Sequence, residues 1–292
     1  MEFVRTLIDC APAEAHAPVS KIRTAVDVAV EAALLKGNVQ AAAVMFRDLE
    51  TGRGFTIQPQ LRFNPASLLK LPMAMGWMRL ATFHSEALDN QLTAKTVAPA
   101  RESDGELITL HNPQLADAPV RLEVGKSYSV LELLGRSIIE SDNDAAKLIG
   151  EELPGKFVQH VFDRFDLPVV TGDDRRTGGV QSFGRMFISL FNATYNTPEA
   201  SEHLLRSLSR TRMKSALVAG VPKGTVVAHK FGVDYDSARG GSGNELHDCG
   251  IIYRPGGPYM LCVMARGAGN QMIAEFIASI STATWRAMDT AD

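Results

Sequence analysis

Segments that predict strands occur near both ends of this 292-residue chain, and the sequence predicts none in the long stretch between them. The five predicted strands lie at 39–46, 55–57, 225–231, 245–253 and 259–265. A sheet has to bury its apolar face against another layer, so the two strand-rich ends are expected to meet in one antiparallel sheet.

Apolar residues at helical spacing occupy the middle of the chain and both of its ends. They predict helices at 20–36, 67–82, 129–139, 143–150, 156–164, 182–193 and 270–287. The terminal helices are expected to pack on the sheet, and the helical middle to lie beside it with a cleft between them. We therefore expect an α/β domain made of residues 1–62 and 213–292, and an all-α domain made of residues 63–212.

Composition and charge restrict the partners of this chain. Hydrophobic residues make up 45% and charged residues 22%, which is typical of a soluble globular protein. A net charge of −3 offers no basic surplus for a nucleic acid, and no run reaches the ~20 apolar residues of a membrane span. The start lacks the features of a signal peptide, which predicts a cytoplasmic protein, or an extracytoplasmic one if the start has been processed. No heptad stands out, so a monomer is favoured.

The spacing of histidine and cysteine predicts neither a metal site nor a cofactor. Seven histidines are scattered singly, and no CxxC or HxxxH pair occurs. Three cysteines do not make a disulfide framework. Cys10 lies in an Ala/Pro-rich start that we expect to be irregular. Cys249 and Cys262 lie in predicted strands, where we expect small buried thiols.

A serine and a lysine at the start of a predicted helix could carry nucleophilic chemistry. In Ser67-Leu68-Leu69-Lys70 the hydroxyl and the amine lie on one face of the helix, one turn apart. This suits a serine nucleophile whose proton a partly neutral lysine removes. The alternative is an exposed pair without a role, because about one Ser-x-x-Lys occurs by chance in a chain of this length.

Two further segments could complete such a site. Ser141-Asp142-Asn143 lies between two predicted helices, where Ser141 could relay a proton and Asn143 could bind a substrate amide or the first lysine. The alternative is an N-cap, which all three residue types favour. Lys230 ends a predicted strand and could bind a carboxylate, while Gly232 could let a substrate lie along the strand. The alternative there is a solvated lysine, and we interpret His229 as structural.

Ser-x-x-Lys, Ser-Asp-Asn and Lys-x-Gly in this order are the motifs of class A β-lactamases and penicillin-binding proteins. The chain resembles this family from about residue 20 to 288, nearly its whole length. The matching segments include Pro65-Ala66-Ser67 to Leu71-Pro72, Tyr128-Ser129-Val130 through Asn143, Val227-Ala228-His229-Lys230 and His247-Asp248-Cys249-Gly250-Ile251-Ile252-Tyr253.

The resemblance implies a three-layer αβα domain beside an all-α domain. It also implies roles for individual residues. Ser67 would attack a carbonyl to form an acyl-enzyme, with Lys70 as its base or partner. Ser141 would pass the proton to the leaving nitrogen, and Lys230 would hold the substrate carboxylate. The backbone N–H groups of Ser67 and Val233 would form the oxyanion hole.

Two departures from the family pattern stand out. Phe231 occupies the position where the family has Thr or Ser, which removes a hydroxyl that helps to hold the carboxylate. The glutamate that activates water for deacylation is also missing, since none occurs between Glu152 and Glu199. Four aspartates lie in that interval: Asp163, Asp166, Asp173 and Asp174. One of the last two could reach the site, but aspartate is a methylene shorter than glutamate, and Arg175 and Arg176 follow directly, so we interpret the pair as a salt-bridged turn.

These observations lead to three functional hypotheses. The first is a serine acyl-hydrolase that reacts with β-lactams or D-Ala-D-Ala-like amides and deacylates slowly. The second is a DD-carboxypeptidase or penicillin-binding protein, which needs no such glutamate and acts on peptidoglycan-like peptides. The third is a non-catalytic ligand-binding or sensor domain, because a fold does not by itself guarantee a function.

Overall fold

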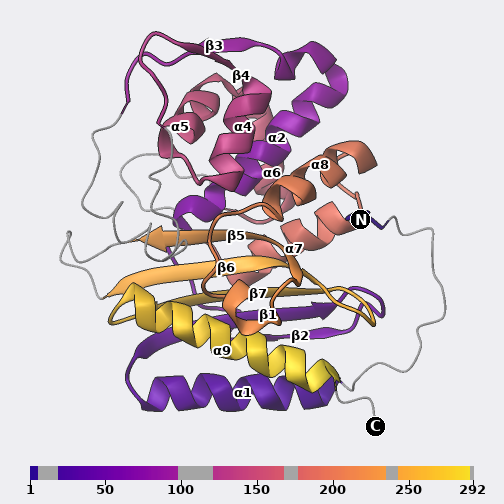
Figure 1. Cartoon of the computed structure of the whole chain (residues 1–292), viewed down its shortest axis with the longest axis vertical. Coiled ribbons are helices and arrows are strands. Elements are labelled where there is room, and N and C mark those ends of the chain that lie inside the picture. The colour runs from indigo at the N-terminus through magenta and orange to yellow at the C-terminus, as the bar shows by residue number, and fades with distance from the viewer. Residues whose placement is uncertain (6–18, 98–120, 168–176, 235–242, 290–292) are drawn as a thin grey trace.

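A computed structural model describes residues 1–5, 19–97, 121–167, 177–234 and 243–289. Figure 1 shows a twisted sheet with two long helices below it and a group of shorter helices above it. Within those described ranges, no helix is long and apolar enough to cross a membrane.

One antiparallel sheet joins the two ends of the chain, which confirms the predicted fold class. Its strands are β1 (Val39–Asp48), β2 (Gly54–Ile57), β5 (Val226–Asp234), β6 (Asn244–Tyr253) and β7 (Tyr259–Gly267). They lie in the order β2-β1-β7-β6-β5. The two ends meet where β1 pairs with β7, with Val44 opposite Val263. This order leaves β5 as an edge strand that faces the helices above (Figure 1).

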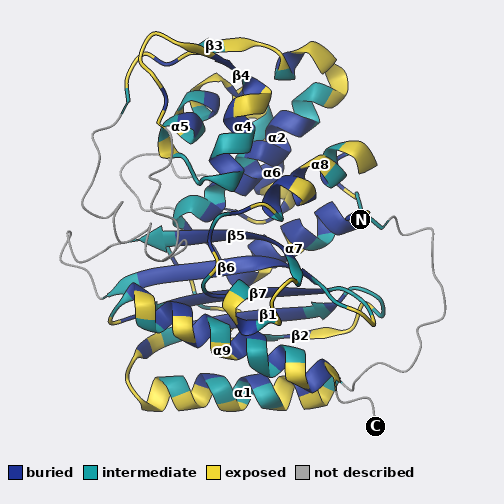
Figure 2. Cartoon of the chain, in the orientation of Figure 1, coloured by how far each residue is buried: buried dark blue, intermediate teal, exposed yellow. Residues whose placement is uncertain are grey.

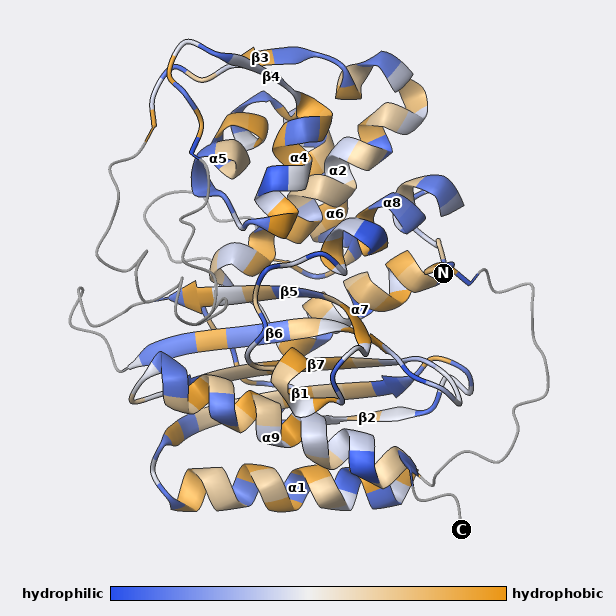
Figure 3. Cartoon of the chain, in the orientation of Figure 1, coloured by the Kyte–Doolittle hydropathy of each residue, from blue (hydrophilic) through white to orange (hydrophobic). Residues whose placement is uncertain are grey.

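Helices cover both faces of the sheet and complete the αβα layers. α1 (Val19–Leu35) and α9 (Asn270–Asp289) pack against each other on one face, as their apolar periodicity predicts. Gly37 follows α1 with a φ of +76°, a conformation that glycine adopts without the steric cost of a Cβ. α7 (Val180–Phe191) packs on β1, β6 and β7 from the opposite side, and Figure 3 shows it as largely hydrophobic.

A group of helices lies above the sheet. They are η1 (Ala66–Leu69), α2 (Lys70–Phe83), η2 (Ser85–Leu88), α4 (Val130–Ile139), α5 (Asn143–Glu152), α6 (Gly155–Arg164) and α8 (Pro198–Leu208). The short η3 (Val218–Gly220) packs instead against α9. A short ribbon of β3 (Gln91–Thr93) and β4 (Ser127–Ser129) caps this group. α2 is apolar on most sides, so it runs buried through the middle (Figure 2).

Residues 1–5, within a segment expected to be irregular, form no regular element but pack against α8 and β6. The amides of Phe3 and Val4 donate to Oε2 of Glu202 at 2.7 and 3.0 Å. The hydroxyl of Tyr253 donates to the carbonyl oxygen of Phe3 at 3.0 Å, and the two rings meet edge to face. Phe3 is consequently buried between the helices and the sheet.

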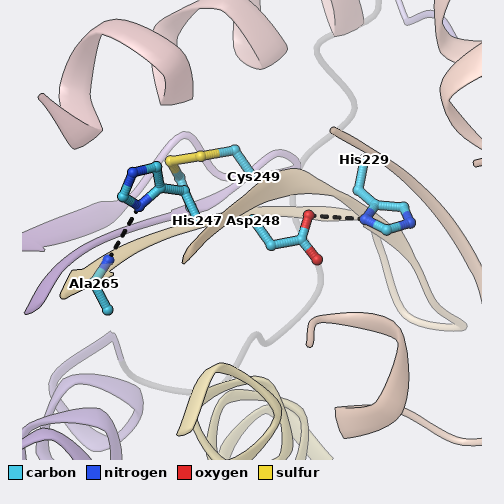
Figure 4. The surroundings of a disulfide bond; sticks show 6 residues. His229, His247, Asp248, Cys249 and Ala265 are labelled. Carbon is cyan, nitrogen blue, oxygen red and sulfur yellow. Dashed lines mark hydrogen bonds and ion pairs between the residues drawn. A yellow bond between two sulfur atoms is a disulfide. The ribbon is translucent and has the colours of Figure 1, made fainter. Parts of the chain in front are cut away.

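The expectation that Cys249 and Cys262 are free thiols is wrong, because the two form a disulfide between β6 and β7 (Figure 4). They lie directly opposite each other in the register, with Cα atoms 3.9 Å apart. The sequence predicts both strands, but not their register. A slip of one residue moves a side chain to the other face of the sheet, so the pairing could not be read from the strands alone. Cys10 lies outside the described residues.

Candidate active site

Ser67 lies in η1, immediately before α2. Its side chain is half-buried, and no side chain or backbone group of the described residues hydrogen-bonds its hydroxyl. Ala66, just before it, has a φ of +48°, which is uncommon for a residue with a Cβ. Backbone outliers of this kind concentrate at functional sites. The turn therefore presents an unpaired hydroxyl at the beginning of a helix.

Lys70 is buried and contacts the loop between α4 and α5. Its Nζ donates to Oδ1 of Asn143 at 2.7 Å and to Oγ of Ser141 at 3.1 Å, and it also hydrogen-bonds the carbonyl oxygen of Ser141. Burial lowers the pKa of Lys70 to about 7, although the charge of Asp142 acts in the opposite direction. A substantial fraction of this amine is therefore neutral near neutral pH.

In the loop between α4 and α5, one residue caps the following helix and another contacts Lys70. Asp142 is the N-cap of α5, and its Oδ1 accepts hydrogen bonds from the amides of Asp144 and Ala145 at 2.9 and 3.1 Å. Ser141 precedes the cap with a φ of +55°. The two alternatives for this tripeptide are therefore both present, in different residues: Asp142 caps the helix, and the Ser141 hydroxyl contacts the lysine.

Lys230 reaches the same hydroxyl from β5. Its Nζ donates to Oγ of Ser141 at 2.9 Å and to the carbonyl oxygen of Phe231 at 3.1 Å. The side chain is fully buried, which excludes the solvated lysine as an interpretation. Burial and the charge of Lys70 hold the pKa of Lys230 well below its ordinary value, and Asp248 only partly opposes them.

The other predicted residues of β5 lie around this lysine. The ring of Phe231 is buried, and its centroid lies 4.1 Å from Nζ of Lys230, so the ring contacts the amine without offering a hydrogen bond. A Cβ on Gly232 would lie 2.4 Å from the carbonyl oxygen of Pro65, so glycine lets β5 approach the turn before Ser67. The substrate contact at Gly232 and the oxyanion role of Val233 stay predictions.

The two aspartates considered for deacylation that the structure describes, Asp163 and Asp166, have partners away from this site. Asp166 is exposed and forms an ion pair with Arg185 at 2.5 Å. Asp163 accepts a hydrogen bond from Gln159 at 2.6 Å. Asp173 and Asp174, with the arginines that follow them, lie outside the described residues. In the part of the chain that is described, His, Cys, Asp and Glu form no cluster that could hold a metal ion.

A buried acid–imidazole pair joins β5 and β6. Nδ1 of His229 and Oδ1 of Asp248 are 2.8 Å apart (Figure 4). The other carboxylate oxygen accepts a hydrogen bond from the amide of Leu217 at 3.1 Å. Both side chains are buried. His229 therefore has a structural partner, as its interpretation as a structural residue requires, and the pair places a carboxylate near Lys230.

The sequence did not draw attention to the residues that hold the turn before Ser67. The main chain of Asn64 is bound by Glu245 and His247, which both come from β6. Their alternation with Cys249 could have placed all three on one face of β6, but nothing in the sequence connects that face with Asn64.

The chain is similar to known proteins. Residues 26–288 match the model of the "Beta-lactamase enzyme family", which is most of the chain. Among solved structures, a PBP-A variant in an acyl-enzyme complex with penicillin G has a TM-score of 0.72 at 20% identity and covers 95% of this chain and 98% of that chain. A search of curated protein sequences found no match.

Two β-lactamase structures are similar to the same extent. The enzyme from Sphaerobacter thermophilus has a TM-score of 0.73 at 19% identity, covering 91% of this chain and 97% of that chain. The TLA-1 extended spectrum β-lactamase has a TM-score of 0.75 at 15% identity, with 92% and 98% covered. At these identities the likeness is one of fold.

Proposed function

The chain belongs to the beta-lactamase enzyme family, and on that premise we propose that it is a serine hydrolase acylated on Ser67 by β-lactams or D-Ala-D-Ala-like amides. One observation carries the proposal. Two buried lysines, Lys70 and Lys230, meet at the hydroxyl of Ser141, and the first of them lies one helical turn from Ser67.

The acylation step uses the neutral fraction of Lys70. The amine removes the proton of Ser67 as its oxygen attacks the amide carbonyl, and backbone N–H groups of Ser67 and Val233 stabilise the oxyanion. The C–N bond then breaks, and the leaving nitrogen takes a proton from Ser141, which Lys70 restores. Lys230 binds the carboxylate of the substrate, whose negative charge favours the protonated amine.

Deacylation is expected to be slow. The glutamate that activates water for deacylation in class A β-lactamases is missing from the sequence, and Asp163 and Asp166 have other partners. Among the described residues no acid contacts Ser67, so none of them is in place to activate water for attack on the ester. The acyl-enzyme should accumulate, which makes it directly observable.

The test is intact-protein mass spectrometry after mixing with benzylpenicillin, followed from minutes to hours. We expect an adduct of one penicillin mass that peptide mapping places on Ser67 and that decays slowly. The Ser67→Ala variant should form no adduct. The control variant Ser85→Ala, which replaces an exposed serine of η2, should react like the wild type. An adduct that survives in Ser67→Ala refutes the nucleophile.

A DD-peptidase is the second candidate, and the missing glutamate favours it. Hydrolysis of a D-Ala-D-Ala peptide that is faster than hydrolysis of benzylpenicillin would assign this activity. A persistent adduct without peptide hydrolysis would instead support a sensor or binding protein. The buried ring of Phe231, which offers no hydroxyl to a carboxylate, is the observation that favours weak substrate binding.

A further inference from the structure

The main chain of Asn64, three residues before the nucleophile, is bound on both sides by side chains of β6. Its N–H donates to Oε2 of Glu245 at 2.6 Å, and its carbonyl oxygen lies 2.9 Å from Nε2 of His247. Only 5% of Glu245 and none of His247 is exposed. A loop residue rarely has both backbone groups satisfied by side chains so distant in sequence, since most such bonds are local or within regular elements.

The direction of each hydrogen bond is fixed by its partners. The amide of Ala265 can only donate, so Nδ1 of His247, 3.3 Å away, accepts. Nε2 therefore carries the ring proton and donates to Asn64. Arg266 donates twice to Oε1 of Glu245, at 2.8 and 2.5 Å, which leaves Oε2 for Asn64.

The charge of Glu245 agrees with this arrangement. Burial by itself raises the pKa of Glu245, but the nearby ring of His247, 3.7 Å away, and the hydrogen bonds from Arg266 and the amide of Asn64 outweigh burial and leave the pKa below its ordinary value. The carboxylate is thus ionised and remains an acceptor for Asn64 near neutral pH.

The side chain of Asn64 binds β5 and the residue directly before Ser67. Its Nδ2 donates to Asp234 at 2.7 Å, and its Oδ1 accepts the amide of Ala66 at 3.1 Å. Ala66 is the residue with a φ of +48°, directly before Ser67. Gly232 closes the turn from the other side, against Pro65. The conformation of the turn is therefore determined by contacts from β5 and β6.

We propose that Glu245 and His247 are positioning residues, which hold the main chain of Asn64 and thereby fix the orientation of Ser67 for attack. Neither residue contacts Ser67. The effect of this restraint on acylation rests on the proposed function, whereas the restraint on the turn itself does not. Loss of the restraint should slow acylation by roughly 10–100-fold, because a displacement of about 1 Å at a reacting group can lower the reaction rate by about 100-fold.

The test compares two replacements of His247 that each keep one hydrogen bond. In His247→Gln the amide nitrogen can occupy the position of Nε2 and still donate to Asn64. In His247→Asn the amide oxygen can occupy the position of Nδ1 and accept from Ala265, but the side chain no longer reaches Asn64. We expect Gln to keep most of the acylation rate and Asn to lose 10–100-fold at similar thermal stability, measured with a chromogenic cephalosporin and by adduct formation.

If His247 contributed to stability alone, His247→Gln and His247→Asn would lower the acylation rate to the same extent. Equal acylation rates in the two variants therefore overturn the proposal. Glu245→Asp provides a second test if His247→Asn does not fold. It keeps the charge opposite Arg266 but withdraws the carboxylate from Asn64, and the same 10–100-fold loss is expected.

Amide hydrogen exchange of a peptide covering residues 61–69, measured without substrate, separates this inference from the proposed function. Exchange there should rise in His247→Asn and Glu245→Asp and stay near the wild-type level in His247→Gln. If the wild type forms no adduct with any β-lactam, the proposed function fails, and the exchange comparison decides the inference. Unchanged exchange in the first two variants overturns it.

Discussion

The side-chain amines of Lys70 and Lys230 hydrogen-bond the same oxygen, the hydroxyl of Ser141, at 3.1 and 2.9 Å. Burial and mutual repulsion make two full positive charges in this position costly. A hydroxyl can accept from both amines or donate to one that is neutral. This is the basis on which we assign Ser141 the transfer of a proton to the leaving nitrogen.

Lys70→Arg should abolish rapid acylation although it preserves the positive charge. Arginine stays protonated at every pH that a protein tolerates, so it cannot accept the proton of Ser67. We expect the acylation rate to fall by about 10²–10⁴-fold, measured by adduct formation over time. The control Lys147→Arg, which keeps the ion pair with Glu151 on α5, should leave the rate unchanged. An undiminished rate in Lys70→Arg removes the lysine from the role of base.

The acylation rate should rise with pH across the interval around 7. The pKa of Lys70 is lowered to about 7, so its neutral, proton-accepting form grows as pH increases through that value and then levels off. Single-turnover acylation from about pH 6 to about pH 8 should show a rise of roughly tenfold before the plateau. A rate that is flat or falls over this interval contradicts Lys70 as the base.

Phe231→Thr should strengthen binding of the substrate carboxylate and weaken the fold. A threonine hydroxyl supplies the donor that the ring lacks, and one hydrogen bond to a charged group corresponds to about tenfold in KM. Loss of the buried ring should reduce the free energy of unfolding by about 2–4 kcal/mol.

Phe231→Val is the matched control, because valine has the shape of threonine without the hydroxyl. Both variants should lose similar stability in urea unfolding, and only the threonine should lower KM for benzylpenicillin. The same KM in both variants shows that the hydroxyl does not meet the carboxylate.

Removal of the disulfide should destabilise the sheet without stopping acylation. The bond between Cys249 and Cys262 closes a loop with a sequence separation of 13, for which the loss of chain entropy in the unfolded state is worth about 3 kcal/mol. We expect the double variant Cys249→Ala/Cys262→Ala to unfold at lower urea and to keep the acylation rate of the wild type. Cys10→Ala serves as the control, and a double variant as stable as this control contradicts the prediction.

Much of the fold could be predicted because its signals are local. The apolar period identified α1, α9 and every strand of the five-stranded sheet, and motif order indicated which side chains could meet. α8 was overlooked although Thr197 caps it and Pro198 begins it, two signals that lie plainly in the sequence. The ribbon of β3 and β4 is too short for a two-residue period to be recognised.

What could not be predicted depends on register and on contacts between distant segments. Whether two cysteines in neighbouring strands face each other depends on single-residue offsets at a turn. The hydrogen bonds of Asn64 to Glu245 and His247 depend on how the helical group sits on the sheet, for which the sequence carries no local pattern. The burial of Lys230, and with it the lowering of its pKa, likewise depends on the assembled cleft.

The pairing of β1 with β7 has a consequence for biosynthesis. β1 leaves the ribosome before the whole helical group, whereas its central partner, β7, leaves after that group. Until then the hairpin of β1 and β2 exposes an apolar strand edge, which is a template for aggregation. The sheet, and the site along its β5 edge, can therefore assemble only after β7 has been synthesised, so this strand edge of a nascent chain stays unprotected while the helical group is made.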